Sequence, residues 1–106
     1  MWRPAETVGQ RGSEDGIIVQ DFEHDSGARI TLERGCTHAP WSVTCGIYGW
    51  FFHTRFLGSE AEAEFDAMST QLIEILHLIP KSDDFEIESD SKVVYTAIQA
   101  FVDRFP

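Results

Sequence analysis

The chain has 106 residues, of which 42% are hydrophobic, and a formal net charge of −10 at pH 7. This length predicts one domain, and the apolar content is typical of a globular protein and not of a disordered one. Such an acidic surface repels the phosphates of nucleic acids and of anionic membranes, so we expect neither as a partner. A basic protein or a cation would be attracted.

The negative charge is concentrated in residues 58–106, which carry a net −8 against −2 for residues 1–57. No apolar run reaches the roughly 18 residues that a membrane span needs, and the first residues lack the apolar stretch of a signal peptide. We therefore expect a cytoplasmic protein. The two cysteines, Cys36 and Cys45, are too few for a disulfide scaffold and are expected to be reduced there.

The chain begins with residues 1–15, which are polar and rich in glycine and charge and predict a flexible arm. Residues 16–106 are expected to form a single α+β domain. The first part of this domain reads as a β-hairpin with the loop Asp25-Ser26-Gly27. That register places Phe22 opposite Ile30 and sets four apolar side chains on one face: Ile18, Phe22, Ile30 and Leu32.

A second β region covers residues 41–57 and contains the aromatic stretch YGWFFHTRF. With a turn at Gly46–Gly49, Cys45 faces Trp50, and the side chains of Trp50, Phe52 and Phe56 point into the core. The outer face then carries Phe51, His53, Arg55 and Leu57, with Tyr48 nearby. A single long bent strand over residues 43–57, with the glycines as bulges, is the alternative.

Two helices are expected after the strands. Ser59 and Glu62 form a capping-box pattern at the start of the first helix, and Pro80 ends it. The second helix runs from about Asp90 to Phe105, with Ser89 or Asp90 as its cap. Apolar residues recur at three- and four-residue steps in both: Ala61, Phe65, Met68, Leu72, Ile75, Leu76 and Ile79, then Val94, Ile98, Phe101 and Phe105.

Strands followed by helices predict an α+β fold: an antiparallel meander of three or four strands (order ββββαα) with both C-terminal helices on one face. In the linker between the helices, Phe85 and Ile87 could reach the core. The other face of such a sheet is normally polar, but here it is expected to be mixed. Exposed aromatic patches mark interfaces.

We therefore expect a non-catalytic binding module, most simply a homodimer joined through the outer sheet face. Its candidate interface or ligand-binding residues are Tyr48, Phe51, His53, Arg55 and Leu57. One alternative is an acidic inhibitor or immunity-type protein that caps a basic partner with its helical half. Another is a small ligand-binding protein or enzyme that uses His53 and Arg55 to hold a carboxylate or phosphate.

The sequence gives little support to catalysis, and we expect neither a metal nor another cofactor. Four residues have side chains that suit zinc, but their spacing matches no zinc motif: Cys36, His38, Cys45 and His53. A Cys–His nucleophile pair built on Cys36 likewise lacks a signature. The acidic run at Asp83–Glu86 lacks the glycine and the order of a calcium-binding loop.

Overall fold

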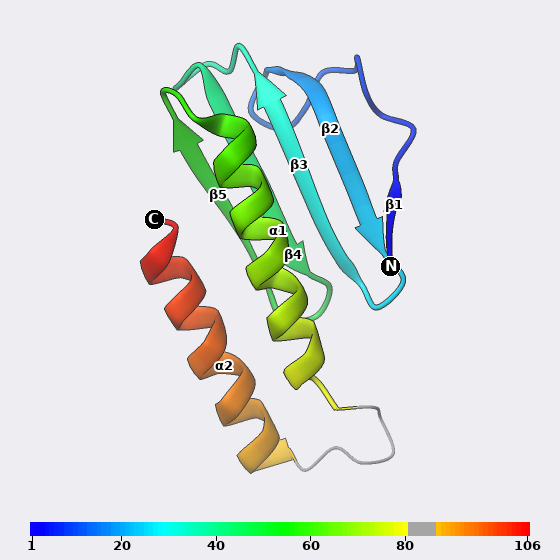
Figure 1. Ribbon diagram of the computed structural model, residues 1–106, viewed down its shortest axis with the longest axis vertical. Coiled ribbons are helices and arrows are strands. Elements are labelled where there is room, and N and C mark those ends of the chain that lie inside the picture. The colour runs from blue at the N-terminus through cyan, green and yellow to red at the C-terminus, as the bar shows by residue number, and fades with distance from the viewer. Residues whose placement is uncertain (81–86) are drawn as a thin grey trace.

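The structure is a computed structural model that describes residues 1–80 and 87–106, and for residues 87–90 the backbone alone. The described strands form one antiparallel sheet in chain order, and two helices follow (Figure 1). The elements are β1 (Trp2–Pro4), β2 (Ile17–His24), β3 (Ala28–Arg34), β4 (Trp41–Ile47), β5 (Phe51–Leu57), α1 (Ala61–Leu78) and α2 (Ile87–Arg104). The predicted α+β fold is confirmed, with five strands in place of three or four.

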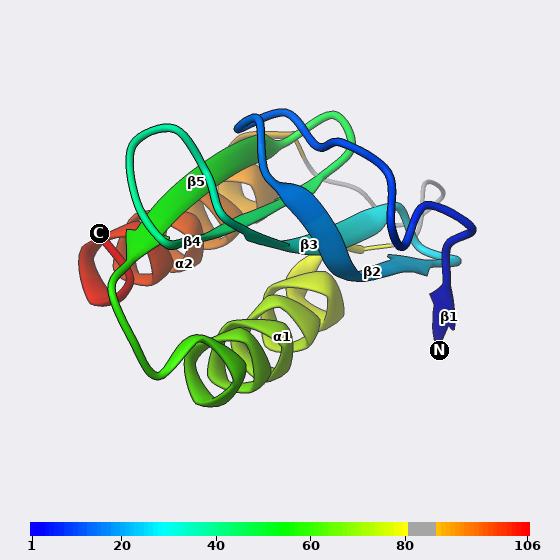
Figure 2. The same cartoon turned by 90° about the horizontal axis from the view of Figure 1, so that it is seen from above.

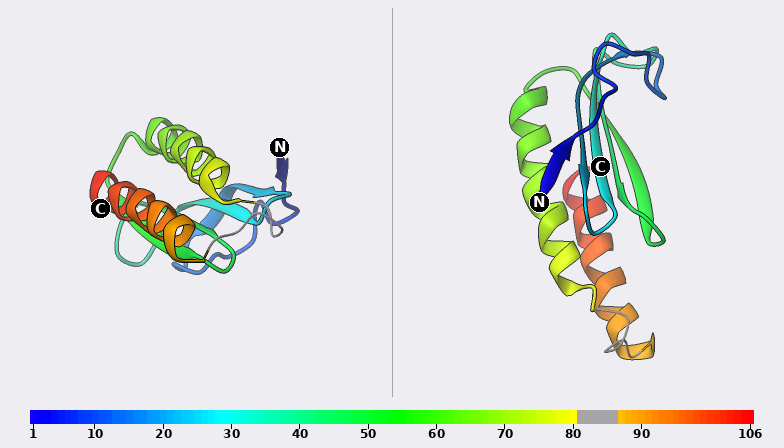
Figure 3. Two further views of the ribbon diagram at one scale, coloured as in Figure 1. Left: turned by 90° about the horizontal axis from the view of Figure 1, so that it is seen from below. Right: turned by 90° about the vertical axis from the view of Figure 1, so that its right-hand side faces the viewer.

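Both helices lie on the same face of the sheet (Figures 2 and 3). Their predicted apolar stripes are buried against side chains of the three central strands, among them Ile30, Leu32 and Val43. The helix residues in this core are Ala61, Phe65, Met68, Leu72, Ile75, Leu76, Val94, Ile98, Phe101 and Phe105. We call the covered side the inner face of the sheet and the opposite side the outer face.

The first hairpin has the predicted register. Phe22 is paired with Ile30, Glu23 with Arg29, and Gly27 takes a φ of 98°, the left-handed conformation that a glycine adopts without strain. A bulge between Ile18 and Gln20 was not expected. It places Ile18 opposite Glu33 and away from the inner core, so Ile18 is buried on the outer face instead.

The segment 1–15, predicted as a flexible arm, runs along β2 in the structure. Its first residues form β1, in which Trp2 is paired with His24 and Pro4 with Phe22. Farther along, the backbone of Ile18 exchanges hydrogen bonds with Gly9 and Gln10. The segment is therefore part of the sheet edge, and it covers one end of the outer face, where it shields Ile18.

The predicted register of the second hairpin is wrong. Ile47 is paired with Phe51, so the loop is Tyr48-Gly49-Trp50, with Gly49 at a φ of 83°. This moves the turn off Gly46 and reverses the two faces of β5. Phe51, His53, Arg55 and Leu57 share a face with the core residues Val43 and Cys45, whereas Phe52, Thr54 and Phe56 lie on the outer face. The alternative of one unbroken strand over residues 43–57 is wrong as well.

Two details of the helix ends also differ from expectation. Glu60 is the residue before α1, with a left-handed φ of 60° and no side-chain cap, so the predicted capping box is not formed. Pro80 does end α1, because Ile79 is already extended. The helix α2 begins at Ile87, which puts the predicted caps Ser89 and Asp90 inside it. The predicted contact of Phe85 lies outside the described residues.

Candidate functional site

The five residues proposed from the sequence do not form a common surface. Tyr48 stands at the tip of the second hairpin and is 92% exposed. Phe51 lies on the inner face, where its ring meets that of Phe101 edge to face at 5.8 Å between centroids. Leu57 is half-buried against the core. The expected outer-face placement of Phe51, His53, Arg55 and Leu57 is therefore wrong, because the register shift turned them toward the helices.

His53 and Arg55 hold β5 to the helices. The Nε2 of His53 lies 2.6 Å from the carbonyl oxygen of Phe105, to which it donates a hydrogen bond. The guanidinium of Arg55 forms an ion pair with Glu64 at 3.2 Å and lies over the Phe105 ring, 5.4 Å from its centroid. Both side chains thus contact α1 or the end of α2 and face the interior, which disfavours the ligand-binding or catalytic role considered for them, although Nη1 of Arg55 is buried without a hydrogen-bond partner in the part of the chain that the structure describes.

The four residues considered for zinc are also separated. Cys45 and His53 are cross-strand neighbours, but Cys36 donates to the hydroxyl of Ser42 at 3.3 Å, and His38 packs edge-on against Phe56. Among the residues that the structure describes, no three His, Cys, Asp or Glu side chains are placed to hold a metal ion. Burial raises the pKa of the Cys45 thiol to about 12, so this thiol is protonated and unreactive at neutral pH.

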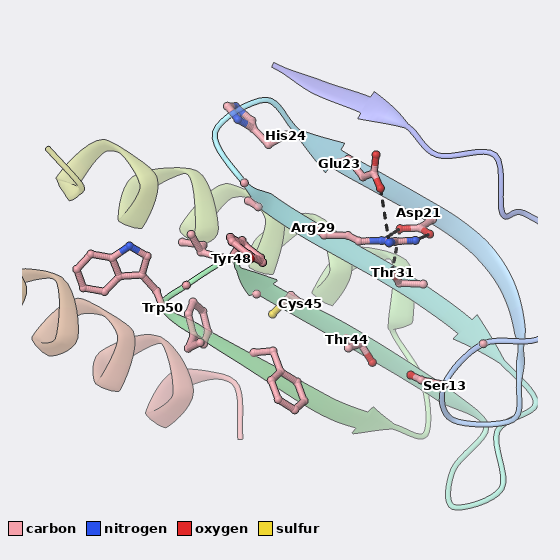
Figure 4. A pocket seen from close by; sticks show the side chains of 18 of the residues that line it. Ser13, Asp21, Glu23, His24, Arg29, Thr31, Thr44, Cys45, Tyr48 and Trp50 are labelled. Atoms are coloured by element: carbon pink, nitrogen blue, oxygen red, sulfur yellow. Dashed lines mark hydrogen bonds and ion pairs between the residues drawn. The ribbon is translucent and has the colours of Figure 1, made fainter. Parts of the chain in front are cut away.

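The outer face of the sheet contains a hollow of about 870 Å³ (Figure 4). The helices lie on the other side of the sheet, so the hollow opens away from them (Figure 3). Ser13 of the N-terminal segment marks one end of the hollow, and the loop with Tyr48 and Trp50 marks the other. Arg29, Thr31 and Thr44 line the hollow between these two ends (Figure 4).

The strand register explains the shape of the floor. One row across the sheet reads Arg29, Gly46, Phe52, and the next reads Thr31, Thr44, Thr54. Neighbouring strands are about 4.8 Å apart, so the Cα atoms of Arg29 and Phe52 stand about 10 Å apart, and the residue between them in this row is a glycine. We call this gap, with Gly46 as floor and Arg29 and Phe52 as walls, the Gly46 slot.

Gly46 is required where it stands. A Cβ added there would lie 2.5 Å from the carbonyl oxygen of Phe51 and 2.9 Å from the Cα of Phe52, both of them main-chain atoms that cannot easily move. The glycine therefore permits the backbone of β5 to approach β4 closely. The slot exists because this position carries no side chain.

The far wall of the slot is held by a buried ion pair. Asp21 is 1% exposed, and its carboxylate accepts hydrogen bonds from Arg29 at 2.6 and 3.1 Å, from Thr7 at 2.6 Å and from Thr31 at 2.9 Å. Burial alone would raise the pKa of Asp21, but the hydrogen bonds from Arg29, Thr7 and Thr31 outweigh it and hold the pKa below its ordinary value. Glu23 adds a weaker contact to Arg29 at 3.5 Å. The charges on this side of the hollow are thus paired.

A second buried carboxylate shapes the other end of the hollow. Glu33 is fully buried, and its Oε1 accepts hydrogen bonds from the backbone N–H groups of Glu14 and Gly16. Gly12 packs directly against this carboxylate, since a Cβ there would overlap the Cδ of Glu33. Glu33 therefore fixes the N-terminal loop over the end of the outer face.

The residues that shape the hollow could be found only in part from the sequence. The cross-strand pair of Glu23 and Arg29 followed from the first hairpin. Phe52 was assigned to the core, and Gly46 to a turn, because the second hairpin was misregistered. The signal available in the sequence was the glycine at position 49, because glycine favours the left-handed conformation that the structure shows in the true loop.

Chemically, the hollow offers an exposed aromatic ring, a guanidinium paired with Asp21, and hydroxyl groups. The carboxylate of Glu33 at its other end is held through Oε1, while its Oε2 is buried without a hydrogen-bond partner among the described residues. This arrangement suits binding through aromatic and apolar contacts better than acid–base chemistry. None of the described helices is long and apolar enough to cross a membrane. No protein-family model, curated protein or solved structure matches the chain, so the geometry of the outer face is what bears on its function.

Proposed function

We propose that the protein is a non-catalytic binding module that works as a homodimer joined through the outer face of its sheet. The observation that carries this proposal is the exposure of Phe52, which is 82% accessible on a strand face that no helix covers. Phe56 on the same face is 43% exposed. Aromatic side chains are enriched in interfaces, and an exposed sheet face is otherwise polar.

The charge distribution favours a second copy of the chain as the partner. Each chain carries a net −10, so two copies repel each other over most of their surface. The stretch 41–57, which forms β4 and β5, contains no Asp or Glu, although the chain has 18 of them. Two copies that meet there bring no carboxylates of these strands together, and a two-fold dimer is the commonest oligomer. The free Cys36 and Cys45 support a reducing compartment such as the cytoplasm.

The proposal is tested by the mass of the protein in solution. Light scattering is recorded from about 1 µM to about 500 µM, the range in which small interfaces associate. We expect wild type to approach the dimer mass and Phe52→Glu to remain a monomer, since a charge would be buried in the contact. Val93→Glu is the matched control, because Val93 is an exposed apolar residue on α2.

A wild-type chain that stays monomeric over the whole range contradicts the homodimer, as does a Val93→Glu variant that dissociates as fully as Phe52→Glu. A monomer would favour the second proposal, an acidic inhibitor of a basic protein. The exposed carboxylates Glu60, Glu62, Asp66 and Glu74 of the α1 region support that alternative. Its binding would weaken steeply with added salt.

A further inference from the structure

The outer faces of β4 and β5 differ in side-chain size in a way that makes them complementary to each other. β5 presents Phe52 and Phe56, and the residues paired with them on β4 are Gly46 and Ser42. A ridge of large side chains thus runs beside a groove of small ones. A surface with a ridge beside a groove can match a copy of itself when a two-fold axis runs midway between the ridge and the groove, because the ridge of each copy then lies over the groove of the other.

The position of such an axis follows from the register. An axis parallel to the strands and midway between β4 and β5 places β5 of one copy over β4 of the other at the same height along the strands. Residues paired within one chain then face each other between the chains: Phe52 lies over Gly46, and Thr54 lies over Thr44. Stacked sheets are about 10 Å apart, a distance that a large side chain facing a glycine can bridge.

We propose that Phe52 of each copy inserts into the Gly46 slot of the other copy. This inference rests on the proposed homodimer and specifies how its two faces meet. Within the slot the incoming ring has the stem of the Arg29 side chain on one side and the resident Phe52 on the other, because Asp21 and Glu23 hold the guanidinium itself toward β2 (Figure 4). An aromatic ring is favoured there by apolar contact with the Arg29 stem and by aromatic packing with Phe52.

The slot is suited to an uncharged ring and not to a free ion. Asp21 accepts hydrogen bonds from the Nε and one terminal nitrogen of Arg29, which fixes the guanidinium toward β2 and pairs its charge, while the Arg29 side chain remains half-exposed. Arg29 and Phe52 are separated by about two strand spacings, which leaves room for the thickness of one ring. A hollow at this place also argues against two flat faces in contact, because they would enclose a void.

The contact is confined to one end of the strands. Ser42 is fully buried beneath the loop of Cys36, and the ring of His38 packs against Phe56. The groove is therefore filled at that end. The open part contains Gly46 and Thr44 on β4, opposite Phe52 and Thr54 on β5. The two threonines share a hydrogen bond at 3.2 Å and can be replaced without loss of an ionised contact.

The experiment tests this geometry by cross-linking two different variants with a short bifunctional maleimide, because residues that face each other across stacked sheets are about 10 Å apart and too far for a direct disulfide. One chain carries Thr44→Cys and the other Thr54→Cys, both with Cys36→Ser so that no native thiol of moderate exposure competes. The buried Cys45 stays, because burial keeps its thiol protonated. After mixing and brief treatment with the cross-linker, we expect the mixed cross-link to exceed either same-variant cross-link by about tenfold, since only the mixed dimer has thiols at both facing positions, 44 of one chain and 54 of the other.

Two further variants address the ring itself. Phe52→Ala removes it and should raise the dimer dissociation constant by about tenfold or more, as is usual for a central aromatic. Tyr48→Ala is the matched control, because Tyr48 is even more exposed and lines the hollow without belonging to the slot. Circular dichroism and urea midpoints verify that every variant is folded.

The outcomes separate the two proposals. A dimer that Phe52→Glu dissociates, with no excess of the mixed cross-link, keeps the outer-face homodimer and overturns ring insertion. An unchanged dissociation constant for Phe52→Ala also overturns ring insertion. A monomeric wild type overturns both. An excess of the mixed cross-link, together with a loss of affinity in Phe52→Ala and not in Tyr48→Ala, supports the proposed contact.

Discussion

At the scale of single residues, Asp21 organises the outer face. Asp21 lies on β2, and its carboxylate joins this strand to two other segments. Its partners are Thr7 in the N-terminal segment and Arg29 and Thr31 on β3. A buried carboxylate is stabilising only when its hydrogen bonds are complete, and here three side chains supply them. Asp21 thereby determines where Arg29, one wall of the Gly46 slot, is placed.

We expect Asp21→Ala to lower the free energy of unfolding by about 3 kcal/mol, because it leaves a guanidinium and two hydroxyls without their acceptor. Urea denaturation measures the change. Glu23→Ala is the matched control, since Glu23 contacts the same Arg29 from an exposed position. Its effect should stay within about 0.5 kcal/mol. Equal losses in the two variants would contradict the role assigned to Asp21.

The same comparison has a pH dependence of known sign. The pKa of Asp21 is lowered by folding, so its contribution to stability is present above its ordinary pKa of 3.8 and is lost as the pH falls through the folded value. The difference between wild type and Asp21→Ala should therefore shrink from about pH 5 to about pH 2. A difference that grows on acidification would contradict this sign.

At the scale of elements, the two hairpins show what could be predicted from the sequence. In the first, apolar residues alternate with polar ones and Gly27 occupies the left-handed position, so only one register buries Ile30 and Leu32. In β5, the neighbours Phe51 and Phe52 are both aromatic, so either register buries a ring. The pattern could not decide which one faces the helices.

The remaining misses have similar causes. β1 is three residues long and contains a proline, and such a strand leaves almost no periodic signal. The capping pattern at Ser59 was outweighed by Glu60, which takes a left-handed conformation as the chain leaves β5 for α1. The helix stripes were predicted correctly because their three- and four-residue period extends over many turns. The candidate site was missed because it depended on the register of β5.

The close approach of β4 and β5 yields a prediction for the hairpin. Gly46→Ala should lower the free energy of unfolding by about 1–3 kcal/mol, because its methyl group meets main-chain atoms of Phe51 and Phe52. Gly58→Ala is the matched control, since a Cβ there meets nothing within 4 Å and no positive φ is involved. It should be neutral or slightly stabilising. Thermal unfolding compares the two, and similar destabilisation in both would contradict the proposed close contact.

At the scale of the whole molecule, charge opposes the association that the outer face favours. Two chains of −10 repel each other, and added salt screens this repulsion. We therefore expect the dimer dissociation constant to fall several-fold between about 0.02 M and about 0.2 M salt, as followed by sedimentation. Binding of a basic partner would respond in the opposite direction. A dimer that weakens as salt is added would point to ion pairs across the contact and away from the stretch 41–57.

The order of the strands has a consequence for how the chain folds. Every strand pairs with the strand next to it in the sequence, so β2 to β5 can assemble through two successive tight loops and one short connection. Closing such short loops costs little entropy, and proteins rich in local contacts fold quickly. The slower steps are then the docking of the two helices and of residues 2–4, whose partners are distant in sequence.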